Sequence, residues 1–322
     1  MASNGSERID LKLVGDWGIA NFHTILGILC ANLRWRSAPG STFWLKMGSG
    51  YRENVDAVGS GEADMGITTP SHVGLSWARE GRFFYDKRPY PDLRALGYYP
   101  QDDRLVLAVR ADTGIKSFED LRRKKYPLRL ATSPRDGDTL MTCAVELAFK
   151  LHGIEPEDIE AWGGKWMGEA RPWVSIPQML TGEADALFWE AISTSWWHEV
   201  SEKVPINFIP FEPSVLAQME REYGLKTDVL PKGWLRNDRE IPCPHWGHFA
   251  FICRAEMSED LAYLITATLV EQRDQVEARY RHLPRERAGM TWPIDPYTMW
   301  QGLGAPLHPG AERYYREHGY MK

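Results

Sequence analysis

The chain has 322 residues, of which 43% are hydrophobic and 25% are charged, with 28 glycines and 21 prolines. This composition excludes a disordered or fibrous protein, and the length suits two ordinary domains better than one. The formal net charge is −6 and no run of basic residues follows a phosphate backbone, so nucleic acid is not expected as a partner.

The N-terminal segment bears on the cellular location. Residues Met1–Asp10 are polar and of mixed charge, and no apolar segment of a secretory leader follows them. The sequence therefore predicts a cytoplasmic protein, or a periplasmic one if a leader has been removed. Residues 19–33 are interrupted by Asn21, His23 and Thr24, so this stretch is too polar to insert into a membrane.

Strand and helix patterns alternate from the N-terminus onward. Strands are predicted at 10–15, 42–47 and 65–68, with helices at 19–33 and about 51–60 between them. The first helix carries one apolar stripe, formed by Phe22, Ile25, Leu26, Leu29 and Leu33. This alternation indicates an α/β sheet with helices on its faces.

Later segments extend the same pattern. Ser117, with Asp120 three residues on, predicts a helix N-terminus, and a further helix is expected between Gly137 and Gly153. The sequence Ser60-Gly-Glu-Ala-Asp-Met-Gly-Ile67 is echoed by Thr181-Gly-Glu-Ala-Asp-Ala-Leu-Phe188, each copy standing between a helix and a short apolar strand. The echo predicts two lobes of similar plan, although a chance match at a common junction is the alternative.

Two apolar segments set the expected domain boundaries. Residues 104–110 and 249–254 read as long strands that bracket about 140 residues with their own alternation of strands and helices. We therefore expect one lobe built from residues 1–104 plus 252–322, and a second lobe built from residues 105–251.

Thiol chemistry is not indicated. The four cysteines have neither the spacing of a zinc site nor that of a disulfide framework, and buried, reduced thiols are expected: Cys30, Cys143, Cys243 and Cys253. Motifs for nucleotide binding, zinc proteases and serine hydrolases are absent from the sequence, so no cofactor or metal is expected.

Four segments carry a family resemblance: Gly48–Val55, Gly61–Asp64, Val109–Leu121 and Pro306–Tyr315. In these segments the chain resembles the type II periplasmic-binding-protein fold and, within it, the TAXI solute receptors of TRAP transporters. The resemblance implies a two-lobed α/β clamshell with a ligand cleft between the lobes. The same fold also hosts cofactor-free enzymes such as hydroxyphthalate decarboxylases, so the fold alone does not decide the function.

The first loop and two later segments depart from the receptor pattern. Receptors of this family have a first loop rich in Gly, Thr and Ser, whereas Gly15–Asn21 contains Asp16 and Trp17. An acid and indoles also stand in Phe188–Ala191 and Cys243–His248. Because ligands of α/β sheets bind beyond the carboxyl ends of strands, we expect the binding residues there: Trp17, Ser49, Tyr51, Thr69, Ser133, Asp138, Trp189 and Trp246.

Candidate catalytic groups follow from the same placement. Glu190 ends an apolar strand beside Trp189, where burial can raise the pKa of a carboxyl group and make it a base near neutral pH. The alternative is an ion pair between Glu190 and Arg171 or another cation. Asp16 is a second candidate, or only a cap for the first helix.

His245 and His248 form an HxxH spacing in a segment that Pro244 and Gly247 mark as a loop. They lack a third ligand for a metal, so each is read as a general acid, as a donor to a phenol, or as a histidine bonded to the backbone. Likewise, Ser49 and Thr69 are either ligand contacts or helix caps, and about half of the tryptophans serve lobe packing.

Two functions remain from the sequence. The first is a cytoplasmic, cofactor-independent carbon–carbon lyase that removes a one-carbon group, for example by decarboxylation, from a small aromatic substrate. Its catalytic residues would be Glu190, His245, His248 and Asp16. The alternative is a TAXI-type receptor for a small aromatic or carboxylate solute. A homo-oligomer is compatible with either.

Overall fold

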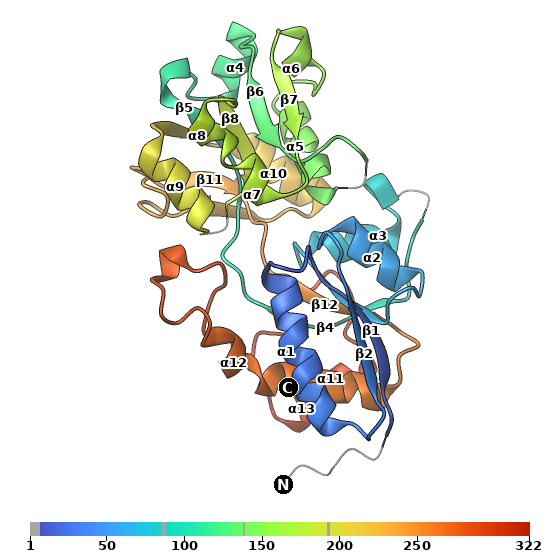
Figure 1. Ribbon diagram of the computed structural model, residues 1–322. Helices are drawn as coiled ribbons and strands as arrows, with labels where there is room; N and C mark the ends of the chain where they lie inside the picture. The colour runs from blue at the N-terminus through green and yellow to red at the C-terminus, as the bar shows by residue number, and fades with distance from the viewer. Residues whose placement is uncertain (1–6, 86–87, 138, 192–193) are drawn as a thin grey trace. The chain divides into compact units, whose positions relative to one another are not determined.

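The computed structural model describes residues 7–85, 88–137, 139–191 and 194–322 (Figure 1). The chain divides into two compact units. Unit 1 comprises Met1–Gln101, Gly247–Leu283 and Met290–Lys322, and unit 2 comprises Asp102–Trp246 and Pro284–Gly289. The sequence analysis places residues 284–289 in the first lobe, whereas the structure places them in unit 2. They belong with unit 2 because the Glu286 carbonyl contacts His198 Nε2 at 2.6 Å and Arg287 pairs with Glu202 at 2.7 Å.

Unit 1 is built on a five-stranded mixed sheet. Its strands are β1 (Asp10–Val14), β2 (Thr42–Lys46), β3 (Met65–Thr68), β4 (Leu93–Tyr99) and β12 (Phe249–Arg254), in the order β2-β1-β3-β12-β4. The late strand β12 runs antiparallel to both of its neighbours. Its helices are α1 (Asn21–Arg36), α2 (Arg52–Gly59), α3 (Val73–Glu80), α11 (Glu259–Glu271), α12 (Arg273–Glu277) and α13 (Pro309–Glu317).

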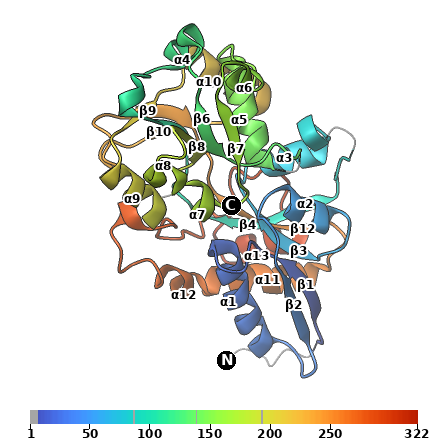
Figure 2. The same cartoon turned by 45° about the horizontal axis from the view of Figure 1, so that its top comes forward.

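Helices cover both faces of the unit 1 sheet. The apolar stripe predicted on α1 is buried as expected, and it joins a core with α11, α13 and inward-facing residues of β1, β3, β4 and β12. On the other face, α2 contributes Val55 and Val58, and the Val58 side chain approaches Gly66 of β3. Figures 1 and 2 show α1, α11 and α13 gathered together, away from α2.

Gly97 is a constrained point in this sheet. It lies in β4 with a φ of 142°, beside an irregularity in the pairing with β12 between Phe251 and Ile252. A Cβ atom at this position would lie 2.3 Å from the hydroxyl of Tyr315 on α13. Only glycine combines this backbone conformation with the close approach of the tyrosine.

Unit 2 repeats the plan of unit 1. Its strands are β5 (Leu105–Arg110), β6 (Arg129–Thr132), β7 (Lys165–Gly168), β8 (Ala186–Glu190) and β9 (Ile206–Ile209), in the order β7-β6-β8-β5-β9. A separate antiparallel pair is formed by β10 (Thr227–Leu230) and β11 (Ile241–Pro244). The helices are α4 (Phe118–Lys124), α5 (Leu140–Leu151), α6 (Asp158–Ala161), α7 (Pro172–Ser175), α8 (Gln178–Thr181), α9 (Ser195–Lys203) and α10 (Pro213–Gln218).

The two sheet orders explain the echo in the sequence. β3 and β8 hold the same central place, and each has an antiparallel strand, β12 or β5, inserted beside it. The two Gly-Glu-Ala-Asp copies lead into β3 and β8 respectively. The predicted α/β class is therefore confirmed, with two mixed sheets of one plan.

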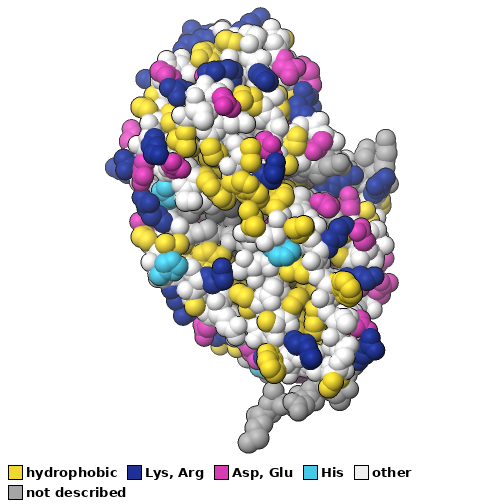
Figure 3. All heavy atoms as spheres, in the orientation of Figure 1, with side chains coloured by type: hydrophobic (Ala, Val, Ile, Leu, Met, Phe, Trp, Pro, Cys, Tyr) yellow, Lys and Arg dark blue, Asp and Glu magenta, His cyan; other side chains and the backbone are white. Residues whose placement is uncertain are grey.

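Local details agree closely with the sequence patterns. Ser117 Oγ accepts the N–H of Asp120 at 3.0 Å at the start of α4, as the capping pattern predicts. The predicted helix after Gly137 begins three residues later, at Leu140, because Gly137 has a φ of 76° and lies outside it. All four cysteines are free thiols. Across the described residues, each helix is too short or too polar to cross a bilayer. The face shown in Figure 3 carries acidic and basic side chains intermixed.

Candidate functional site

The carboxyl edge of the unit 1 sheet carries several of the predicted residues. Asp16 follows β1, Thr69 follows β3, and Gln101 follows β4 by two residues. His248 immediately precedes β12, which lies between β3 and β4, so it comes to the same edge.

Asp16 serves as a helix cap. Its Oδ2 accepts the N–H of Phe22 at 2.8 Å and its Oδ1 accepts the N–H of His23 at 3.1 Å, both in the first turn of α1. Burial raises the pKa of Asp16, and the two backbone N–H groups oppose that rise. The capping alternative raised from the sequence therefore describes this side chain.

Removing this cap should weaken unit 1. We expect Asp16→Ala to lower the free energy of unfolding by about 0.5 to 2 kcal/mol, because two N–H groups at the start of α1 lose their acceptor. Asp16→Asn keeps one acceptor oxygen and should lose less. Urea titration of the three proteins tests this, and an alanine variant as stable as wild type would contradict the capping role.

Aromatic side chains stand beside Asp16. Trp17 is half-buried and meets the buried Tyr51 edge to face, with ring centroids 6.2 Å apart. Tyr51 is the N-cap residue of α2 by its backbone conformation, and no side chain caps that helix. Ser49 is half-buried two residues earlier, so the structure does not support its alternative role as the cap.

Buried polar atoms at this edge lack partners among the described residues. These are the hydroxyl of Thr68 and both polar atoms of the Gln101 amide, on side chains 1% exposed. His248 contacts the Gln101 backbone, with Nδ1 accepting the N–H at 2.9 Å, and stacks on Tyr98 at 4.7 Å. Buried polar groups are normally satisfied, so open positions on Thr68 and Gln101 mark a place for a polar ligand or water.

The carboxyl edge of the unit 2 sheet carries Glu190. This residue ends β8 and pairs in register with Leu105 at the start of β5. The Trp197 indole N–H donates to the Glu190 carbonyl at 2.7 Å. Arg171, proposed from sequence as an ion-pair partner of Glu190, pairs instead with Glu169, at 3.1 Å between Nε and Oε1. Ser133, also predicted, is fully buried, and its hydroxyl meets that of Thr142 at 2.7 Å.

Asp103 joins Glu190 as a second buried acid. It is fully buried and precedes Leu105 by two residues. Burial raises the pKa of Asp103 well above its usual range, and the nearby charge of Glu190 raises it further. Unit 2 thus holds two buried carboxyl groups near each other at the end of its sheet.

Next to this pair lies a charged cluster. The Arg104 guanidinium lies 3.1 Å from Asp228 Oδ2, and the same oxygen lies 3.1 Å from His245 Nδ1. Burial raises the pKa of Asp228, but the His245 hydrogen bond and the Arg104 charge outweigh it and leave that pKa lowered. Arg104 also stacks over Trp234 at 5.2 Å. Within the described part of the chain, no three His, Cys, Asp or Glu side chains are placed to ligate a metal.

The remaining predicted residues are placed as follows. Trp189 and Trp246 are fully buried in unit 2, and the Trp246 N–H donates to the Asp103 carbonyl at 2.9 Å. His245 lies in unit 2 and His248 in unit 1, so the HxxH spacing does not form one site within a unit. Asp138 falls outside the described residues.

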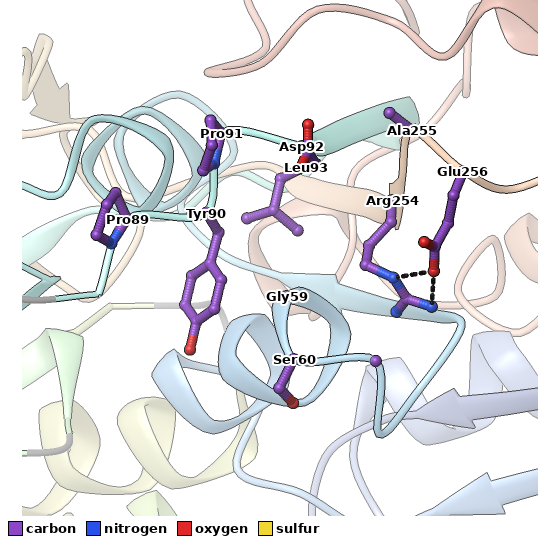
Figure 4. A pocket seen from close by; sticks show the side chains of 11 residues that line it. Gly59, Ser60, Pro89, Tyr90, Pro91, Asp92, Leu93, Arg254, Ala255 and Glu256 are labelled. Atoms are coloured by element: carbon purple, nitrogen blue, oxygen red, sulfur yellow. Dashed lines mark hydrogen bonds and ion pairs between the residues drawn. The ribbon is translucent and has the colours of Figure 1, made fainter.

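A separate pocket of about 640 Å³ lies at the opposite edge of the unit 1 sheet, where β4 begins and β12 ends (Figure 4). Arg254 faces it, but its guanidinium is held by Glu256 and donates to the carbonyls of Val58 and Ala63. Because the Arg254 guanidinium already binds groups of the protein, we do not choose this pocket as the candidate site.

Sequence reasoning missed Asp103, Arg104, Thr68 and Gln101. The polar run Gln101–Arg104 directly before an apolar strand was the available signal for three of them. Thr68 ends a predicted strand, but sequence could not show that its hydroxyl is buried without a partner among the described residues, because that depends on tertiary packing.

Two solved structures are similar over nearly the whole chain. One is described as a periplasmic transporter, with a TM-score of 0.54, 11% identity, and coverage of 98% of this chain and 93% of that one. The other is a TctC solute-binding protein from Polaromonas, with a TM-score of 0.51, 11% identity, and coverage of 99% and 97%. At this identity the likeness concerns the fold, which is the two-lobed periplasmic-binding-protein fold that the sequence predicted.

The prediction of a carbon–carbon lyase is wrong. The two similar structures are described as a periplasmic transporter and a solute-binding protein, and neither is described as an enzyme. Within the units, Asp16 caps α1, His245 Nδ1 lies 3.1 Å from Asp228 Oδ2, and His248 Nδ1 accepts the N–H of Gln101.

The family assignment rests on a match over most of the sequence. A family model matches residues 45–319, which include the echo, both strands that enter the sheets in antiparallel sense, and the Pro306–Tyr315 segment. The narrower resemblance to TAXI receptors is not resolved by this match. The chain belongs to the NMT1-like family.

Proposed function

We propose that the protein is a solute-binding receptor of a transport system. The observation that carries this proposal is that the buried side-chain polar atoms of Thr68 and Gln101 have no hydrogen-bond partner among the residues that the structure describes. They lie at the carboxyl edge of a sheet, where α/β proteins bind ligands. A binding protein needs such groups to hold a solute without transforming it. The solute-binding character of the matched TctC protein supports the same function.

The finer proposal is a TAXI-type receptor for a small aromatic solute. Two observations support it. The first is the resemblance to TAXI receptors in the four segments named in the sequence analysis, and the second is the pair of rings formed by Trp17 and Tyr51 at the carboxyl edge of the unit 1 sheet. A half-buried indole offers a flat apolar face to a ring. Such a receptor acts outside the cytoplasmic membrane, so under this proposal the protein is periplasmic; the comparisons lend no support to the cytoplasmic location predicted from sequence.

A receptor differs from an enzyme in that it binds its solute without converting it. The purified protein should be screened by calorimetry against small aromatic acids, amines and alcohols, and each mixture analysed by mass spectrometry after prolonged incubation. We expect heat of binding for at least one class and full recovery of every compound. Conversion of a bound compound into a product, or recovery of the native protein in the cytosolic fraction of its host, would contradict the proposal.

Trp17 should contribute strongly to affinity. We expect Trp17→Ala to weaken binding of an aromatic solute by roughly 1 to 3 kcal/mol, or about 5- to 150-fold, through lost ring contact. The matched control is Trp35→Ala, because Trp35 is 85% exposed near the far end of α1. Titration of all three proteins by calorimetry checks this, and equal affinities for the two variants would place the solute elsewhere.

A further inference from the structure

The unit 2 sheet ends in a strand with an open edge. β9 is the last strand in the sheet order, and within the sheet it pairs with β5 in antiparallel sense. The Ala111 N–H donates to the Pro205 carbonyl at 2.8 Å. Because the bonds of an antiparallel pair alternate, Asn207 also faces β5, whereas Ile206 and Phe208 direct their backbone groups away from it. Among the residues that the structure describes, these outward N–H and C=O groups have no hydrogen-bond partner, so they can pair with an added strand.

A pocket of about 410 Å³ lies along this open edge, and all of its lining belongs to unit 2. Besides Ile206 and Phe208, the lining includes three basic side chains and one acidic side chain: Lys116, Arg236, Arg239 and Asp238. Neither Lys116 nor Arg239 forms an ion pair within the described part of the chain. Arg236 is 64% exposed and lies 3.6 Å from Glu202. The pocket therefore offers an excess of positive charge to a ligand.

Two asparagines hold the basic segments beside β9. Asn207 Nδ2 donates to the Ile115 carbonyl at 3.1 Å, which fixes the backbone next to the lysine of the pocket. The buried Asn237 stands in the loop that carries both arginines, and its Nδ2 donates to the carbonyls of Pro231 and Arg239 at 2.8 and 2.7 Å. The positions of the basic residues along the edge are thus set by the fold before a ligand arrives.

The mixture of groups favours a peptide over a small anion. Basic side chains and outward N–H groups attract an anion, but the outward carbonyls of Ile206 and Phe208 need donors, which a free carboxylate or phosphate lacks. An extended peptide offers N–H and C=O groups in turn along its own edge, and its acidic side chains can pair with the arginines and the lysine. One ligand of this kind satisfies both sets of groups.

We propose that the β9 edge is a docking site for an extended acidic segment of a partner protein, which adds a strand to the unit 2 sheet and places its carboxylates beside Lys116, Arg236 and Arg239. This inference goes beyond the solute-binding function and does not depend on it, because none of the pocket residues is among those proposed to hold the solute. Backbone hydrogen bonds supply the attachment, and the charge of the side chains selects the segment.

Synthetic peptides test the strand and the charge separately. The probe is a capped hexapeptide that alternates Glu and Thr. It is compared with a peptide that alternates Lys and Thr, with glutarate, and with two N-methylated forms of the acidic peptide, methylated at the Glu or at the Thr residues. We expect the acidic peptide to bind most tightly, and only one methylated form to lose binding, because alternate N–H groups of an added strand face β9. Raising the ionic strength from about 0.05 M to about 0.3 M should weaken binding.

Three results of these titrations overturn the inference. The first is tighter binding of the basic peptide or no binding of the acidic one, which contradicts the charge. The second is equal binding of both methylated forms, which contradicts strand addition. The third is binding of glutarate as tight as that of the acidic peptide, which makes the pocket a site for small anions.

Charge variants test the basic side chains. Lys116→Gln combined with Arg239→Gln should weaken binding of the acidic peptide about fivefold or more, since each exposed ion pair contributes modestly. The control combines Arg123→Gln with Arg221→Gln, which removes the same charge from positions 64% and 66% exposed outside the pocket. Equal affinities of the two double variants overturn the inference.

A proline tests the open edge. Ile206→Pro removes an outward N–H while keeping the bonds to β5, because proline is tolerated on the open side of an edge strand. It should weaken peptide binding about three- to tenfold, the loss of one hydrogen bond, whereas Ile206→Val should not. Unchanged binding in the folded proline variant overturns the inference, and if that variant does not fold, the methylated peptides decide. Failure of the peptides leaves the receptor function to its own solute screen.

Discussion

Replacing Arg104 by methionine is expected to lower the free energy of unfolding by about 3 to 5 kcal/mol, as is typical when one partner of a buried ion pair is removed. The Arg104 side chain is only 9% exposed and lies 3.1 Å from Asp228. Without it, the buried Asp103 and the partly buried Asp228 would lose the positive charge that lowers the pKa of both carboxyl groups. Methionine keeps the length of the side chain, so the loss reports the charge more than the volume.

The control for this experiment is Arg221→Met. Arg221 contacts Glu222 at 2.7 Å, but its side chain is 66% exposed. Exposed pairs contribute little, so this variant should differ from wild type by less than about 0.5 to 1 kcal/mol. Both variants are measured by chemical denaturation at pH 7. Equal losses would show that the cluster around Arg104 is not desolvated as the structure describes.

Replacing Gly97 by alanine should also lower the free energy of unfolding strongly, by about 2 to 5 kcal/mol, because backbone strain and overpacking act together. The residue has a φ of 142°, and the added Cβ would lie 2.3 Å from the Tyr315 hydroxyl. Tyr315 is itself fully buried and donates to the Leu96 carbonyl at 3.1 Å, so it cannot move aside easily.

Gly27→Ala is the matched control, with the opposite sign. Gly27 lies inside α1 with no heavy atom within 4 Å of the added Cβ and no positive φ. Alanine should therefore stabilise the helix by about 0.5 to 1 kcal/mol. Thermal and urea unfolding of both variants checks the pair, and a loss at Gly27 comparable to that at Gly97 would contradict the explanation.

Local patterns predicted local structure well. The stripe from Phe22 to Leu33 is buried along α1, and Ser117 caps α4, because both depend on residues a few positions apart. The echo of residues 60–67 at 181–188 indicated the common plan, since each copy leads into the central strand of its sheet.

The site was predicted less well because it depends on contacts distant in sequence. Glu190 was singled out for its place at a strand end, but the second buried acid, Asp103, lies 87 positions earlier and comes near it through the pairing of β5 with β8. The HxxH spacing suggested a pair of histidines, yet the chain passes from unit 2 to unit 1 between them. Spacing cannot reveal such a crossing.

The place of β12 has a consequence for synthesis on the ribosome. The sheet of unit 2 is complete once β9 has emerged at Ile209, whereas β4 of unit 1 has no strand beside it until Phe249–Arg254 is made. Domains fold as units while the chain grows. The nascent protein therefore holds β3 and β4 with open edges during the translation of about 150 further residues, and such edges are the surfaces that chaperones must shield from aggregation.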